Sequence, residues 1–375
     1  MNLNNRIQSL NALNESIWYD NISRQMIESG QLKKLVETGI TGVTSNPSIF
    51  EKSISTSHEY DSAIFEYTNT GLEPEQIFEK LAIADISKAC DLLHPTYLRS
   101  NFTDGFASIE VSPNLAHNTN ATIEAGIRIF EQINKPNVMI KVPATSAGIP
   151  AIRELISTGI NVNVTLIFSL DSYHQVREAY ISGLEDRLQK GKPISTIMSV
   201  ASFFLSRVDT IVDSHLDGLN NPDKYSHLLG TAAIANAKQA YMDFRTTFNS
   251  DRFEQLLLKG GQIQRPLWAS TSTKNPNYSP LLYVEELIGN HIVNTMPDNT
   301  LELFLNEGQV QETISNNLEI SQSNLNEIRS ISNFDEMTSQ LLSDGLKQFA
   351  DSYNMLLQII DSKSKEIINS KILGD

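Results

Sequence analysis

Eight short runs rich in β-branched and aromatic residues recur along the chain, and segments with helical periodicity separate them. This alternation is typical of parallel strands joined by crossover helices. Eight is also the number of strands that closes a parallel sheet into an α/β TIM barrel, the (β/α)8 fold, without free edges. The expected strands are residues 17–20, 42–46, 106–111, 138–142, 162–168, 196–202, 266–270 and 292–295.

The 375 residues accommodate such a barrel, which needs about 250 residues, together with additions. We expect one domain over residues 1–375, with a barrel core at about 16–297 and a helical C-terminal extension at 298–375. Additional helices are expected in the long intervals after the second and sixth strands. An open doubly wound sheet is the structural alternative, but it normally has a glycine-rich phosphate loop after its first strand, and none is seen.

Several helix boundaries can be predicted from capping residues. Pro74 suits the first turn of a helix, Asn118 or Thr119 precedes a periodic run that ends at residue 133, and Asp171 precedes one that ends near residue 190. After residue 297 no strand pattern remains, and apolar residues between 346 and 360 repeat at helical spacing. This spacing predicts a terminal helix packed on the barrel.

The net charge of −15 opposes general binding to nucleic acid or to an anionic membrane, because both need a basic face. An anionic substrate must therefore meet local cations. The single cysteine, Cys90, excludes an intrachain disulfide and suits buried packing in a reducing compartment. The segment 1–6 lacks the apolar core of a signal peptide, so we expect a cytoplasmic protein.

Active sites of such barrels lie at the carboxyl ends of the strands, so polar residues that end apolar runs are the candidates. Lys141 follows the apolar run of the fourth expected strand. Burial disfavours the charged form of an amine, and a neutral amine can attack a ketone to form an imine. The alternative is a lysine at the end of an edge strand whose ammonium group reaches water.

Two carboxylates occupy similar positions. Glu110 ends the third expected strand and Asp20 ends the first. Imine chemistry needs acids and bases to move protons during carbinolamine formation, dehydration and carbon–carbon cleavage. Each acid alone could instead be a loop ligand or a helix cap, and Asp20 in particular could cap the following helix.

Neutral polar side chains and two cations complete the candidate set. Asn46 precedes a proline, and Asn163 and Thr165 alternate with apolar residues. Side chains of this kind supply hydrogen bonds to the hydroxyl groups of a polyhydroxylated substrate. They could equally be a turn former and a polar inner layer of the barrel. Arg207 and Lys274 follow the sixth and seventh strands, where barrels often bind phosphate, although either could be a surface ion-pair partner.

These residues resemble those of the transaldolase family, in the same order along the chain. Residues 44–50 (TSNPSIF) are similar to its amino-terminal signature, and residues 138–145 (VMIKVPAT) resemble its Schiff-base strand. Residues 108–111 (SIEV) and 163–169 (NVTLIFS) resemble the neighbouring strands. The lysine beyond the seventh strand and the long tail resemble the longer bacterial and cyanobacterial-like subgroup.

The resemblance implies a class I aldolase barrel that transfers a dihydroxyacetone unit between sugar phosphates. It implies that Lys141 is the nucleophile, that Asp20 is the acid/base at the substrate hydroxyl, and that Glu110 and Thr165 position a water. The residues that it implies for substrate binding are Asn46, Asn163, Ser202, Phe204, Arg207, Ser270 and Lys274.

No cofactor and no metal are expected, because imine chemistry needs neither and the seven histidines show no paired ligand spacing. The expected partners are sugar phosphates alone, with no nucleic acid and no membrane, and the chain should act as a monomer or homodimer. Two alternatives remain open at this point. One is an aldolase that cleaves fructose 6-phosphate and releases free dihydroxyacetone, and the other is a barrel that binds sugar phosphates without catalysis.

Overall fold

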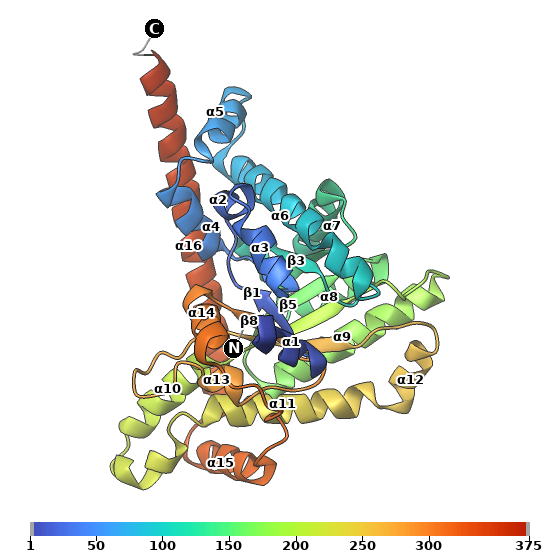
Figure 1. Cartoon of the computed structure of the whole chain (residues 1–375), viewed down its shortest axis with the longest axis vertical. Helices are drawn as coiled ribbons and strands as arrows, with labels where there is room; N and C mark the ends of the chain where they lie inside the picture. Colours follow the sequence, from blue (N-terminus) through green and yellow to red (C-terminus); the bar gives the residue numbers. More distant parts are fainter. Residues whose placement is uncertain (1–3, 373–375) are drawn as a thin grey trace.

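The computed structural model describes residues 4–372. The first three residues of the predicted amino-terminal segment 1–6 and the last three of the chain lie outside it. Eight strands form a closed barrel in chain order, and every neighbouring pair is parallel, including the closing pair β1–β8 (Figure 1). The predicted (β/α)8 barrel is therefore confirmed.

Each expected strand is present within a few residues of its predicted bounds, because alternating apolar and small polar side chains pack on both faces of the barrel wall. The strands are short, and almost every residue in them is buried. Their bounds are β1 Ser16–Tyr19, β2 Gly42–Thr44, β3 Phe106–Glu110, β4 Val138–Pro143, β5 Val162–Ile167, β6 Ser199–Phe204, β7 Gln264–Ala269 and β8 Val293–Met296.

The long intervals hold the additional helices that the sequence predicted. The interval between β2 and β3 contains α4 Pro47–Thr56, α5 Asp61–Asn69 and α6 Pro74–Arg99. The interval between β6 and β7 contains α10 Ser206–Asp217, η2 Pro222–Leu228, α11 Ala232–Phe248 and α12 Asp251–Leu257. The remaining connections are α1 Asn4–Ala12, α2 Arg24–Glu28, α3 Gln31–Thr38, η1 Pro113–Leu115, α7 Thr119–Ile133, α8 Gly148–Thr158, α9 Leu170–Gln189 and α13 Leu282–Glu285.

Local capping explains where two of these helices begin. Of the two predicted caps, Asn118 and Thr119, it is Asn118 that caps α7, by accepting a hydrogen bond from the Ala121 amide. For α9 the predicted cap was wrong by two residues, because Ser169 accepts from the Ser172 amide and Asp171 lies in the first turn. A carboxylate in the first turn is stabilised by the helix dipole, so both positions favour the same helix start.

The C-terminal extension forms α14 Asp298–Glu307, α15 Leu318–Ile331 and the 39-residue helix α16 Phe334–Ile372. Helix α16 lies beside α4 and continues past α5 (Figure 1), and it also contacts α6, α10 and the end of β5. The predicted helical spacing buries Phe349, Tyr353, Leu356 and Ile360. Helix α16 therefore packs along the carboxyl end of the barrel, where the candidate residues lie.

The core is one large apolar cluster between strands and helices, and a smaller cluster joins α1, β1 and α14. Cys90 is fully buried in the large cluster, as predicted. The amino end of the barrel holds buried charges instead: Arg265 donates to Ser16 at 2.7 Å and lies 3.5 Å from the Asp104 carboxylate. Within residues 4–372 no helix is both long and apolar enough to cross a membrane.

Candidate active site

The parallel register of the barrel brings Lys141 and Glu110 to the same level on adjacent strands, where they are Cα partners of the β3–β4 pair. The Lys141 side chain is 6% exposed, and its Nζ donates to the Ser45 carbonyl at 2.9 Å. The same Nζ lies 4.0 Å from Glu110 Oε2. The structure thus places the amine inside the barrel, close to a buried carboxyl group.

Asp20 lies just after β1 and faces the same space. Its Oδ1 accepts a 2.6 Å hydrogen bond from Thr44 Oγ1. Burial raises the pKa of Asp20, while the Thr44 hydroxyl and the Lys141 charge act in the opposite direction. Asp20 and Lys141 line one cavity of about 120 Å³ at the carboxyl end of the barrel.

That cavity gathers most of the candidate residues from seven different strand ends and from α16. Its walls are Asp20, Thr44, Asn46, Lys141, Thr165, Ser202, Phe204, Arg207, Ala269, Ser270, Thr295 and Phe349. A small, buried space with convergent polar groups is the arrangement expected of a binding site for a small polar molecule.

Glu110 and Thr165 carry unpaired polar atoms beside the lysine. Burial raises the pKa of Glu110 to about 7, the nearby Lys141 charge opposes this, and Asp20 adds to it. Glu110 Oε2 and Thr165 Oγ1 are both buried, and neither has a hydrogen-bond partner among the described residues. Buried polar atoms of native proteins nearly always have partners, so both atoms are free to hold water or substrate.

The two asparagines differ in how they meet the cavity. Asn46 Oδ1 accepts from the Ile49 amide at 3.0 Å, so this residue caps α4 and also lines the cavity. Asn163 is fully buried below it, donating to Ser108 at 3.1 Å and accepting from Ser202 at 2.7 Å. Asn163 does not line the cavity, and it holds Ser202, which does.

The two predicted phosphate ligands lie in different surroundings. Arg207, in the first turn of α10, lines the cavity with its guanidinium 5.7 Å from the centre of the Phe204 ring. Burial lowers the pKa of Arg207, and Asp344 on α16 opposes this effect. Lys274 is exposed, donates to Ser272, and is not part of the cavity wall.

Ser270 directly follows β7 and has a left-handed backbone (φ 56°), and its hydroxyl forms a 2.8 Å hydrogen bond with that of Ser206. This bond joins the end of β7 to the start of α10, the helix that carries Arg207. Among residues 4–372, no group of three or more histidine, cysteine or acidic side chains is arranged to hold a metal ion.

Sequence reasoning missed four residues of the cavity wall, Thr44, Ala269, Thr295 and Phe349. The hydroxyls of Thr44 and Thr295 are 2.8 Å apart, so a pair of strand-end threonines supports Asp20. Both threonines end β-rich runs, a signal that could have included them. Phe349 comes from α16. The helical spacing of the apolar residues in this segment indicated that Phe349 packs against the barrel, but it did not indicate which part of the barrel.

The fold and the site together define a (β/α)8-barrel enzyme with its reactive groups at the carboxyl ends of the strands. The chain belongs to the family described as Transaldolase/Fructose-6-phosphate aldolase, whose match covers residues 17–360.

Similarity over nearly the whole chain to proteins named transaldolase agrees with this. The chain is 43% identical to Transaldolase 2 of Nostoc sp., with 96% of this chain and 98% of the relative aligned. It is 42% identical to the transaldolase of Mycobacterium tuberculosis (95% and 96% aligned) and 41% identical to that of Trichodesmium erythraeum (97% and 98%). The predicted family, including its cyanobacterial relatives, is confirmed.

Proposed function

We propose that this family member transfers a dihydroxyacetone unit from sedoheptulose 7-phosphate or fructose 6-phosphate to glyceraldehyde 3-phosphate or erythrose 4-phosphate. The observation that carries the mechanism is the buried Lys141 amine, 4.0 Å from the Glu110 carboxyl in a cavity that Asp20 also lines. We place the reaction in the non-oxidative pentose phosphate pathway and the enzyme in the cytoplasm.

In the first half of the reaction, the neutral Lys141 amine attacks the C2 carbonyl of the ketose and forms a carbinolamine. Glu110, whose pKa is raised by burial, supplies the proton with which the C2 hydroxyl leaves as water. The unpaired Thr165 hydroxyl holds that water together with Glu110. The product of these steps is an iminium between Lys141 and C2.

Carbon–carbon cleavage then depends on Asp20. Its carboxylate takes the proton of the C4 hydroxyl, the C3–C4 bond breaks, and its electron pair neutralises the iminium as an enamine. The aldose product leaves and the acceptor aldehyde enters. Carbon C3 of the enamine attacks the aldehyde, whose oxygen receives the proton from Asp20, and water hydrolyses the new iminium to release the product ketose.

The phosphate group of the substrate would lie at the Arg207 end of the cavity, where Ser270 offers a hydroxyl and the partly buried guanidinium provides charge. Lys274 would reach the phosphate only if the loop after β7 moves inward. Asn46, Ser202 and Phe204 would surround the dihydroxyacetone unit, and Asn163 would bind it by exchanging its bond to Ser202 for a substrate hydroxyl.

We propose that substrate binding moves a side chain of the cavity wall, because the space in this structure is small. A site for a ligand of this size usually has a volume of about 300 Å³ or more, whereas the cavity has about 120 Å³. Phe349 on α16 is the large side chain that the extension contributes to the wall. We assign to it the movement that opens the site.

The competing activity is cleavage of fructose 6-phosphate with release of free dihydroxyacetone, since the family description names both reactions. An assay with fructose 6-phosphate, with and without erythrose 4-phosphate, separates the two. Transfer predicts sedoheptulose 7-phosphate only when the acceptor is present and little free dihydroxyacetone without it. Steady release of dihydroxyacetone without acceptor would favour the aldolase, and binding without any turnover would favour the non-catalytic barrel.

A further inference from the structure

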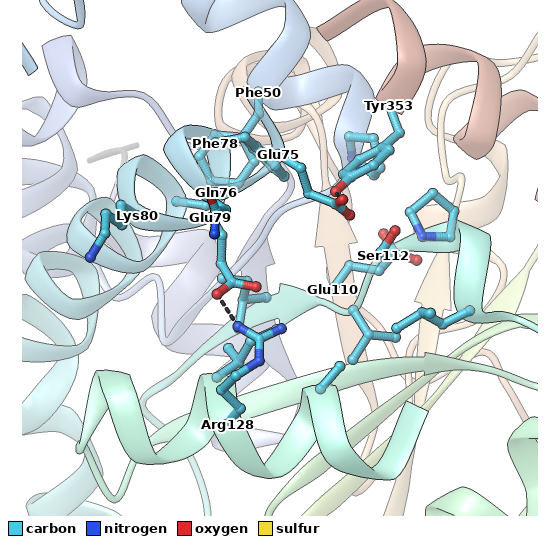
Figure 2. Close-up of a pocket in the computed structure, with 18 of the residues that line it drawn as sticks. Phe50, Glu75, Gln76, Phe78, Glu79, Lys80, Glu110, Ser112, Arg128 and Tyr353 are labelled. Carbon is cyan, nitrogen blue, oxygen red and sulfur yellow. Dashed lines mark hydrogen bonds and ion pairs between the residues drawn. The ribbon is translucent and has the colours of Figure 1, made fainter. Parts of the chain in front are cut away.

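A second, larger cavity of about 730 Å³ adjoins the catalytic cavity on the side of β3. It lies between α4, α6 and α7, and one residue of α16 closes part of it (Figure 2). Asn46 lines both cavities, and Ser45 and Glu110 line the inner end of the larger one. We call this space the side chamber.

The inner end of the side chamber holds two buried polar atoms that form no direct hydrogen bond with a described residue, Glu110 Oε2 and Ser112 Oγ. The Ser112 hydroxyl nevertheless lies close enough to Tyr353 to lower the pKa of that tyrosine. The Glu110 side chain is 7% exposed, yet it belongs to the chamber wall and also lies beside Lys141. A cavity of this volume, with these two oxygens at its inner end, meets the requirements for ordered water there.

A series of polar groups leads from that end to the surface. Tyr353 is 4% exposed, and its hydroxyl donates to Glu75 Oε1 at 2.8 Å. The pKa of Tyr353 is raised mainly by burial and also by the hydrogen bond to Glu75. The nearby Ser112 hydroxyl lowers it. Figure 2 shows the side chains of Glu110, Ser112, Tyr353 and Glu75 near one another in the chamber. Glu110 lies beside Lys141 and Glu75 is exposed, so we infer that these groups connect the lysine with solvent.

The other walls suit a route for small polar molecules. One face of α7 contributes Ala121, Ala125 and Arg128, and the Arg128 guanidinium forms an ion pair with Glu79 of α6 (Figure 2). The small side chains of the two alanines leave the chamber open between its inner end and this ion pair. A substitution at Ala125, which is 6% exposed, would project directly into the space.

We propose that the side chamber is the route by which water leaves and re-enters the catalytic centre, with Ser112 and Tyr353 as positioning residues along it. The proposal rests on the proposed function, in which every turnover releases one water when the imine forms and consumes one when it is hydrolysed. During both steps the sugar phosphate fills the main cavity between Asp20 and Arg207. A separate route behind Glu110 lets water reach C2 while the substrate stays in place.

The balance of the step is simple. On imine formation the C2 oxygen leaves as water, taking a proton from Glu110, and passes into the chamber. On hydrolysis a chamber water gives one proton to Glu110 while its oxygen bonds to C2. The proton of the new C2 hydroxyl then passes to nitrogen as the C2–nitrogen bond breaks, which restores the ketone and the Lys141 amine. No other reactant is needed.

The test uses the Asp20→Asn background, in which fructose 6-phosphate forms the imine without being cleaved and therefore keeps the main cavity filled. The enzyme is mixed with fructose 6-phosphate, samples are reduced with borohydride at increasing times, and the Lys141 adduct is quantified by mass spectrometry. A second series follows the decay of the adduct after dilution. Ala125→Leu narrows the chamber, Tyr353→Phe removes one hydroxyl, and Tyr180→Phe is the matched control.

Tyr180 is a suitable control because its buried hydroxyl also makes a hydrogen bond, at 2.6 Å to the Gln262 carbonyl, but far from the chamber. Loss of one hydrogen-bonding group on the route should slow both formation and decay by about fivefold in Tyr353→Phe, and Ala125→Leu should slow them at least as much. Because a blocked route affects both directions equally, the adduct fraction at equilibrium should not change. Tyr180→Phe should leave the rates unaltered.

Unchanged rates in both folded chamber variants would overturn the proposal. So would slower rates with an altered equilibrium fraction, since that result indicates a displaced Lys141 rather than a blocked route. If Ala125→Leu does not fold, Tyr353→Phe alone decides by the same two criteria. A background enzyme that forms no adduct on Lys141 would instead contradict the proposed function, so the two failures are distinguishable.

Discussion

Replacing Glu110 with glutamine should remove activity and, at high pH, stabilise the protein. Burial raises the pKa of Glu110 from 4.5 to about 7. The pKa of this carboxyl group is higher in the folded state than in the unfolded state. Such a group contributes its full stabilisation only at a pH below the pKa of the unfolded state. That contribution is lost as the pH rises through about 7. The ionised Glu110 therefore weakens the enzyme under the conditions in which it works.

The rise in the pKa of Glu110 from 4.5 to about 7 corresponds to a total change of about 3 kcal/mol in the free energy of unfolding, because one pKa unit equals about 1.4 kcal/mol. Most of this change falls between pH 5 and pH 8. Glutamine keeps the size of the side chain but does not titrate. The unfolding free energy of Glu110→Gln should therefore gain about 2 to 3 kcal/mol relative to the parent between these two pH values.

Urea unfolding of both proteins at pH 5 and pH 8 measures this gain. Glu124→Gln is a control, since Glu124 is exposed on α7 and its replacement should change stability by less than about 0.5 kcal/mol at either pH. Turnover of Glu110→Gln should fall by about 10² to 10⁴-fold, as for loss of a general acid–base. A stability difference that is the same at both pH values would refute the reasoning.

Three further outcomes follow from the site and its supports. Arg207→Ala should raise KM for phosphorylated substrates by about 10 to 100-fold in steady-state kinetics and leave unphosphorylated ones unaffected, and equal effects on both would remove its phosphate role. Thr44→Val removes the 2.6 Å hydrogen bond to Asp20 and should shift the acidic limb of kcat/KM to higher pH, so an unmoved limb would contradict the assigned role of Asp20. Arg24→Ala leaves the fully buried Asp85 without its 3.0 Å ion-pair partner and should lower the unfolding free energy by about 3 kcal/mol in urea unfolding. A loss below about 1 kcal/mol would show that the buried Asp85 carboxyl does not depend on Arg24.

The barrel could be predicted from sequence because its signals are local. Each strand is a short apolar run bounded by turns, and the polar residue that ends a run must lie at the carboxyl mouth of a parallel barrel. That rule alone predicted that Lys141, Glu110 and Asp20 would be close together, and they are. The helix caps were predicted less well, since serine and aspartate two residues apart at 169 and 171 favour the same helix start.

Features that depend on contacts between distant segments could not be predicted. Phe349 and Tyr353 looked like ordinary core positions of a terminal helix, and only the path of α16 places them at the two cavities. The side chamber has no local signal either, because its walls come from several elements within residues 45–132 and from Tyr353 on α16. Lys274 illustrates the converse, since its position after β7 suggested a ligand whereas its side chain points to solvent near Ser272.

The central claim is that one buried amine carries the sugar between donor and acceptor. The most direct measurement is reduction of the enzyme with borohydride in the presence of fructose 6-phosphate, followed by a peptide map of the modified chain. The account predicts a single stable adduct on Lys141, within residues 137–145, and none when the substrate is omitted. An adduct on another lysine, or none at all in an active enzyme, would contradict it.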